Sequence, residues 1–303
     1  MSQQMDNRAW AGLLFLSVLW GGSFFFVGVA VTEVPPLTIA AIRVLLAAVI
    51  LQIVLRLSGL VLPWRREVWQ GFLVSGLLNN AIPFSLFFWA QSQIPSGLAS
   101  ILNAMTPIFT VLVAHVFTAD EKLTPPRLLG VLIGFTGVTV MIGTDLLSGI
   151  GHNVLAQGAC LLATLSYALG AVYSRRFSRL GVAPMQVAGG QFIASSAILV
   201  PLALLVEQSW QIATPSWPAI AAIVALAVLS TALGFVIYFR VMTVAGSNVN
   251  LVTLLVPVSA ILLGALVLGE QLAPRHFAGM AIIALGLLAI DGRVLSLIRR
   301  SRA

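Results

Sequence analysis

The stretch Thr106–Glu121, TPIFTVLVAHVFTADE, decides how the rest of the chain is interpreted. It is an apolar segment with a proline near its start and acidic residues at its end. Lys122–Arg127 (KLTPPR) and a glycine-punctuated apolar run follow it. Because a bilayer is crossed by a helix of about 20 apolar residues, and because prolines mark turns, this stretch predicts one membrane helix followed by another.

The same pattern occurs a second time, at Val256–Glu270 (VPVSAILLGALVLGE) and Gln271–Arg275 (QLAPR). Corresponding residues are Pro107/Pro257 at an offset of 150 and Glu121/Glu270, Pro125/Pro274, Gly130/Gly279 and Gly137/Gly286 at 149. Upstream, Trp20 corresponds to Tyr167 at an offset of 147. The chain therefore reads as two copies of one unit, which we place at residues 1–147 and 148–303.

The composition is that of an integral membrane protein. Of 303 residues, 59% are hydrophobic and 8% are charged, against about 25% charged residues in soluble domains. The net charge of +7 comes from short basic clusters between apolar segments, which is typical of topology determinants and argues against a nucleic-acid partner. The single cysteine, Cys160, cannot form a disulfide within the chain.

Ten segments are apolar and long enough to span a bilayer. They are residues 9–31, 36–57, 68–90, 95–118, 126–144, 153–175, 184–206, 217–239, 245–269 and 275–292. Five helices per copy is an odd number, so the second copy must enter the membrane in the opposite sense. The predicted fold is an all-α polytopic membrane protein, with ten transmembrane helices arranged as two inverted five-helix repeats around a central cavity.

Basic residues predict the orientation of these helices. With both termini in the cytoplasm, 14 of the 16 lysines and arginines lie in inner loops and tails, and the reverse orientation would place them outside. We therefore expect cytoplasmic N- and C-termini.

Polar and aromatic side chains at mid-depth are the candidate binding residues, because in lipid such groups must face another helix or a cavity. Asn79 and Asn80 lie at the centre of the third helix, and Asn103 and Asn250 lie on similar faces of the fourth and ninth. Trp20 and Tyr167 are bulky and equivalent in the two repeats, which favours a pocket wall. The full predicted set is Trp20, Phe24, Asn79, Asn80, Phe84, Asn103, Ser166, Tyr167, Tyr238, Asn250 and Thr253.

Two prolines at equivalent positions, Pro107 and Pro257, each remove a backbone donor. We expect them to kink their helices and free the carbonyls of Asn103 and Thr253. Paired irregular helices near the midplane are typical of transporter sites.

The charged residues limit the chemistry. All nine acidic residues fall at helix ends or in loops, so proton or sodium coupling through a buried carboxylate is not supported. Arg43 lies within a span; it can reach toward the surface, pair with a helix end such as Glu33, or meet a substrate carboxylate. Catalytic motifs such as HExxH and GxSxG are absent, and His115, His152 and His276 lack ligand spacing, so we expect no enzyme activity, no cofactor and no metal.

The chain resembles the EamA-type members of the drug/metabolite transporter superfamily. The resemblance rests on Leu19–Phe25 (LWGGSFF), Arg43, the Asn103–Pro107 stretch leading to Ala119–Gly130 (ADEKLTPPRLLG), and the second copy at Val256–Gly279. The resemblance covers nearly the whole chain, and within the family the chain is most similar to the bacterial aromatic amino acid exporters. It implies a bacterial inner-membrane protein that works by alternating access, with the first, third, fourth, sixth, eighth and ninth helices around the cavity.

We therefore expect an exporter or facilitator of amino acids or of similar small metabolites, and the resemblance implies aromatic or neutral amino acids. The partners are a small amino acid-like substrate and membrane lipid, with monomer and homodimer both open. Two alternatives remain at this stage. One is a drug or nucleotide-sugar carrier of the same superfamily, and the other is a channel-like membrane subunit without a transport cycle.

Overall fold

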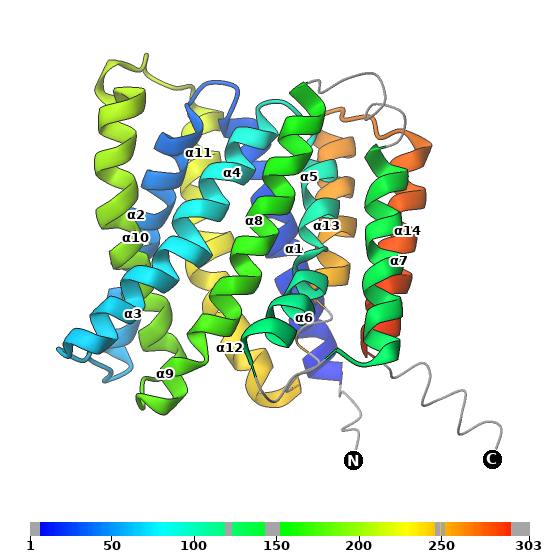
Figure 1. Cartoon of the computed structure of the whole chain (residues 1–303). Helices are drawn as coiled ribbons and strands as arrows, with labels where there is room; N and C mark the ends of the chain where they lie inside the picture. Colours follow the sequence, from blue (N-terminus) through cyan, green and yellow to red (C-terminus); the bar gives the residue numbers. More distant parts are fainter. Residues whose placement is uncertain (1–6, 119–122, 143–151, 246–248, 250–251, 292–303) are drawn as a thin grey trace.

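The computed structural model describes residues 7–118, 123–142, 152–245, 249 and 252–291, and throughout these ranges the regular structure is helical, without strands. Seven helical stretches of 21 to 26 residues are long and apolar enough to cross a membrane, and three shorter apolar helices accompany them. Together they account for the ten predicted spans and confirm a polytopic helical fold (Figure 1).

The spans follow one another in chain order. They are α1 (Asn7–Ala30), α2 (Pro36–Leu57), α3–η1–α4 (Arg66–Gly76, Leu77–Ala81, Ile82–Gln91), α5–α6 (Ser96–Asn103, Thr106–Phe117), α7 (Pro125–Ile142), α8 (His152–Ser174), α10 (Pro184–Glu207), α11–η4–α12 (Trp217–Ala225, Leu226–Leu233, Gly234–Ala245), α13 (Val252–Val267) and α14 (Pro274–Asp291). Two short helices, α9 (Arg176–Arg179) and η3 (Ser209–Gln211), lie in connections. The eighth span is longer than predicted, because nothing between residues 239 and 245 breaks a helix.

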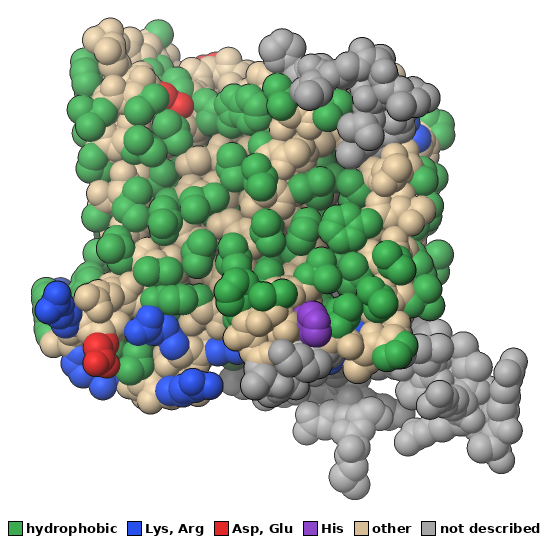
Figure 2. All heavy atoms as spheres, viewed as in Figure 1, with side chains coloured by type: hydrophobic (Ala, Val, Ile, Leu, Met, Phe, Trp, Pro, Cys, Tyr) green, Lys and Arg blue, Asp and Glu red, His purple; other side chains and the backbone are tan. Residues whose placement is uncertain are grey.

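The two ends of the bundle differ in charge. The first turn of α1 and the last turn of α14 lie at the same end, toward the bottom of Figure 1. Lysine and arginine side chains gather along this edge in Figure 2, and an apolar flank separates it from the other end. We call it the basic end, after Arg56, Arg65, Arg66, Arg175, Arg176 and Arg179, and the other the opposite end. That the basic end faces the cytoplasm stays a prediction of the charge distribution.

The fifth helix of each repeat shows the inversion directly, because α7 and α14 pack together through their glycines. A Cβ added at Gly137 would lie 2.8 Å from the carbonyl oxygen of Gly279, and one added at Gly286 would lie 2.6 Å from that of Gly130. The later glycine of each helix thus meets the earlier glycine of the other. Equivalent helices therefore run antiparallel, as an inverted repeat requires.

The remaining helix pairs obey the same symmetry. The second helix of the first repeat, α2, packs against its equivalent α10. The packing of α1 on α13 is matched by the packing of α8 on α5 and α6. The predicted boundary between the repeats, at residues 147 and 148, lies outside the described residues and stays a prediction.

A π-helical segment interrupts the third span and its equivalent, the eighth, near their centres. In a π-helix the carbonyl of Leu78 would accept from residue 83, but Pro83 has no N–H. The hydroxyl of Ser166 on α8 donates to this carbonyl instead, at 2.7 Å. In the eighth span the hydroxyl of Thr231 donates to the carbonyl of Leu226 at 2.8 Å. Neither segment is predicted by the hydrophobic pattern of the sequence.

The two prolines have different surroundings. Pro107 lies in the first turn of α6, after a break between α5 and α6, and the freed carbonyl of Asn103 accepts a hydrogen bond from the Thr106 hydroxyl at 2.8 Å. Pro257 lies inside α13, which continues through it. The helix is thus broken only in the first repeat, within the described residues.

Candidate functional site

A cavity of about 810 Å³ lies at the centre of the bundle. Among the described residues, eight of the ten spans contribute to its wall, and α7 and α14 do not. Beyond the six helices that the resemblance implies, α2 contributes Arg43 and α10 contributes Gln191. The cavity reaches from Gly181–Pro184, at the basic end, to Gln91, the last residue of α4 near the opposite end. A space of this size suits a small organic molecule, since ligand pockets hold about 300–1,000 Å³.

Most of the predicted residues line this cavity. Nine of the eleven do so: Trp20, Phe24, Asn79, Asn80, Phe84, Asn103, Tyr167, Tyr238 and Thr253. Ser166 does not, because its hydroxyl is bonded to the carbonyl of Leu78. Asn250 lies outside the described residues. The role of these side chains in binding stays a prediction.

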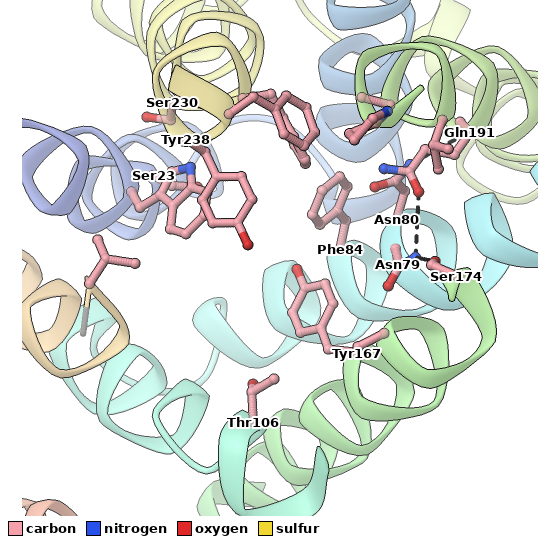
Figure 3. A pocket seen from close by; sticks show the side chains of 18 of the residues that line it. Ser23, Asn79, Asn80, Phe84, Thr106, Tyr167, Ser174, Gln191, Ser230 and Tyr238 are labelled. Carbon is pink, nitrogen blue, oxygen red and sulfur yellow. Dashed lines mark hydrogen bonds between the residues drawn. The ribbon is translucent and has the colours of Figure 1, made fainter. Parts of the chain in front are cut away.

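Aromatic rings form opposite walls of the cavity. Trp20 stacks on Tyr238 with ring centroids 5.4 Å apart, and Tyr167 stacks on Phe87 at 6.1 Å. The hydroxyl groups of the two tyrosines point into the same space from opposite sides (Figure 3). Room for the Trp20 indole comes from Gly234, where an added Cβ would lie 2.8 Å from the indole nitrogen. These rings offer flat apolar surfaces with polar edges to a ligand.

An amide cluster occupies a third part of the wall. The side-chain nitrogen of Asn79 donates to the hydroxyl of Ser174 and to the side-chain oxygen of Gln191, at 3.4 Å each (Figure 3). Asn80 donates to the hydroxyl of Ser195 at 3.2 Å. Long hydrogen bonds of this kind leave the amides free to exchange partners for a ligand. Gln191 is not among the residues predicted from the sequence, although a glutamine within an apolar span is a signal of a buried polar site.

Arg43 is the cation of this cavity wall, and two of the three placements open from the sequence are wrong. Its side chain is only 7% exposed, so it does not reach the surface. Glu33 does not pair with it, since the Glu33 carboxylate accepts from the backbone N–H and hydroxyl of Ser216 at 2.6 Å each. Arg43 instead donates from Nε to the hydroxyl of Thr231 at 2.9 Å, and its guanidinium carbon lies 3.9 Å from the ring centroid of Phe84.

Two further polar groups of the wall have no hydrogen-bond partner in the described part of the chain. They are the side-chain oxygen of Gln91 and the hydroxyl oxygen of Ser230, both buried. Both atoms are closed off from the cavity space, so a ligand or water reaches them only after the wall rearranges.

Carboxylates join the helices at the opposite end. The Glu207 carboxylate accepts from the backbone N–H of Thr38 at 2.7 Å, at the start of α2. Glu270 accepts from the N–H of Ser96 at 2.8 Å, at the start of α5. Glu33 accepts from Ser216, just before α11. These hydrogen bonds, from the Ser216 hydroxyl first and its N–H second, lower the pKa of Glu33 from its ordinary value. Each contact satisfies a helix start that would otherwise lack an acceptor.

Comparisons with known proteins agree with this architecture. The model of the EamA-like transporter family matches residues 8–143 and again residues 155–290. The uncharacterized inner membrane transporter YedA of Escherichia coli strain K12 is 27% identical over 92% of this chain and 89% of its own. A probable amino-acid metabolite efflux pump of the same strain is 27% identical over 90% of this chain and 91% of its own. A crystal structure superimposes with a TM-score of 0.66 at 23% identity, over 96% of this chain and 98% of that one, which shows a shared fold.

Proposed function

Because this chain belongs to the EamA-like transporter family, we propose that it moves amino acids or similar small amphipathic metabolites through its central cavity. Its class, a multi-pass membrane transporter, follows from the family and from the apolar spans. The substrate class is the proposed part.

The observation that carries the proposal is the mixed wall of the cavity. Trp20, Tyr167 and Tyr238 supply apolar ring faces, while the amides of Asn79 and Gln191 supply hydrogen-bond donors and acceptors. An amino acid has the same two halves, one apolar and one strongly hydrogen-bonding. A purely apolar drug would offer these amides no partner better than their long hydrogen bonds to Ser174 and to each other, and so would gain nothing from them.

The relatives support export across an inner membrane. The pump from E. coli is named for efflux of amino-acid metabolites, and YedA is named for the inner membrane. The arginines of the basic end, with the positive-inside rule, favour a cytoplasmic position for that end. The cavity wall reaches the basic end at Gly181, so substrate would enter from the cytoplasm.

Alternating access would then require the opposite end to open. Glu33, Glu207 and Glu270 each tie the end of one span to the start of another there. An outward-open state must exchange some of these hydrogen bonds for water, which costs least at the exposed Glu33–Ser216 contact, because Thr38 and Ser96 are buried. We propose these three contacts as the closed gate of the cycle.

Transport is tested by counterflow. Proteoliposomes preloaded with an unlabelled amino acid should take up a labelled amino acid faster than empty ones do. In a panel of labelled amino acids, aromatic ones should be among the best substrates. Uptake that does not respond to internal amino acid would indicate a channel and would contradict the proposal.

Specificity is tested by Trp20→Ala. We expect a larger loss for tryptophan and phenylalanine than for alanine, because the ring of Trp20 stacks in the wall. Trp217→Ala is the matched control, since Trp217 is 77% exposed and lies outside the cavity. An equal loss for large and small amino acids in folded Trp20→Ala protein would remove Trp20 from the specificity pocket.

A further inference from the structure

We propose that Arg43 is an anion anchor in the cavity, so that what the transporter recognises is a carboxylate attached to an apolar group, and a substrate ammonium is not required. This inference specifies the substrate of the proposed function, and it rests on that function because it takes the cavity to be the transport path. It extends the expected substrates from amino acids to aromatic and other apolar monocarboxylates without an amino group.

The position of the guanidinium is fixed by the protein on one edge and one face. Nε is bonded to the hydroxyl of Thr231, and the plane lies against Phe84 at 3.9 Å and near Phe88 at 5.6 Å. The two terminal nitrogens make no hydrogen bond to any described residue, while the side chain lines the cavity. Two parallel N–H donors on a held guanidinium match the two oxygens of a carboxylate.

The charge of Arg43 has no counter-charge within the described residues. No carboxylate lies among the residues that line the cavity, and the carboxylates of Glu33 and Glu207 are engaged at the opposite end. Arginine stays protonated in proteins, and an unpaired cation removed from water is strongly disfavoured. An ionisable side chain within a membrane span therefore points to a ligand that supplies the missing charge.

The other polar groups of the described wall are neutral hydroxyls and amides, such as those of Tyr167 and Asn79. An ammonium group would find such neutral oxygens and ring faces such as Trp20, but no carboxylate among the described lining residues.

The cavity wall thus carries one positive charge and no negative charge among its lining residues. A monoanion neutralises it, a zwitterion adds an unneeded cation, and an organic amine adds repulsion. We therefore expect a binding order of monocarboxylate at least equal to zwitterion, and both far above the cation.

Three probes of nearly equal shape separate these cases: phenyllactate (anion), phenylalanine (zwitterion) and phenylalaninamide (cation). Binding is measured by ligand-induced thermal stabilisation of the detergent-purified full-length protein, titrated to give an apparent Kd. We expect the two carboxylates to stabilise the wild type and the amide to fail. Arg43→Gln should weaken both carboxylates by at least about tenfold, since hydrogen bonds to a charged group are lost. Arg56→Gln, the same change on the same helix at an exposed position outside the cavity, should match the wild type.

Equal stabilisation by phenylalaninamide, unchanged carboxylate affinity in Arg43→Gln, or stabilisation of the wild type by none of the probes would each overturn the anchor. If Arg43→Gln does not fold, the comparison of carboxylates with the amide on the wild type decides alone. Counterflow of phenyllactate tests transport separately. Binding without flux would refute the proposed function but not the role of Arg43 as anion anchor. Flux of phenylalanine, with binding that does not depend on Arg43, would refute the role of Arg43 but not the proposed function.

Discussion

Gly170→Ala should disturb the cavity while leaving the fold intact. Gly170 on α8 faces the side chain of Asn79, and a Cβ added there would lie 2.6 Å from the Asn79 side-chain carbonyl carbon. The Asn79 side-chain oxygen lies closer still. Ordinary contact begins at 3.4 Å, so the amide must retreat by at least about 0.8 Å, the difference between 3.4 and 2.6 Å. Both hydrogen bonds of the Asn79 amide are already 3.4 Å long, so such a shift breaks at least one.

Two effects on stability then oppose each other. Alanine in place of glycine favours a helix interior by about 0.5–1 kcal/mol. Loss of one or two long hydrogen bonds costs a similar amount, about 0.5–1.5 kcal/mol each at most. We expect Gly170→Ala to be about 1 kcal/mol less stable than Gly158→Ala, because Gly158 on the same helix has nothing within 4 Å of an added Cβ and gains the helix term alone.

The effect on transport should be clearer than the effect on stability. Loss of one amide hydrogen bond to substrate, about 1 kcal/mol, corresponds to a roughly fivefold higher KM in counterflow, with kcat little changed. Thermal unfolding in detergent gives the stability difference, and the double variant Gly170→Ala/Asn79→Ala tests the contact. In that variant the added methyl meets no amide, so the two changes should be non-additive by about 1 kcal/mol. Equal stability and equal KM for Gly170→Ala and Gly158→Ala would refute the placement of Asn79.

The other predictions concern the scaffold around the cavity. Gly286→Ala should lower stability by about 1–3 kcal/mol, because the methyl would meet the backbone carbonyl of Gly130 at 2.6 Å and backbone cannot move aside; unchanged unfolding temperature would contradict this. Glu270→Ala should cost about 1–2 kcal/mol in thermal unfolding, the range for lost helix caps, and stability equal to the wild type would show that water replaces the carboxylate. The hydrogen bonds from Ser216 lower the pKa of Glu33. The contribution of Glu33 to folding stability is therefore present above the ordinary carboxyl pKa and is lost as the pH falls through the lowered pKa. The stability difference between wild type and Glu33→Gln should therefore shrink on acidification below about pH 4.5, and a difference that grows there would reverse the assignment.

Much of the fold was readable from the sequence because its signals are local. Apolar length fixes the spans, and the offset between Pro125 and Pro274 fixes the repeat, from which the inversion follows by counting helices. Polar side chains at mid-membrane depth predicted most of the cavity wall, because a group such as Asn79 avoids lipid and faces a cavity or another helix.

The rest depends on contacts between distant parts of the chain. Ser166 shares a helical stripe with Tyr167, yet its hydroxyl is taken by the Leu78 carbonyl, which lacks its usual donor because of Pro83. The surroundings of Arg43 depend on Thr231, 188 residues away, which no local pattern can reveal. Both cases involve a π-helical segment, a feature that adds a residue to a turn without changing the hydrophobic pattern.

The glycine contact between α7 and α14 bears on how the two repeats fit together. Gly137 contacts Gly279, and the equivalent residue Gly286 contacts Gly130, so the same contact is made twice. This is the self-complementary geometry of an isologous dimer. A five-helix unit with two glycines seven residues apart can therefore make this contact with an upside-down copy of itself. Two such units joined in one chain keep the contact unchanged, at a place away from the lining of the cavity.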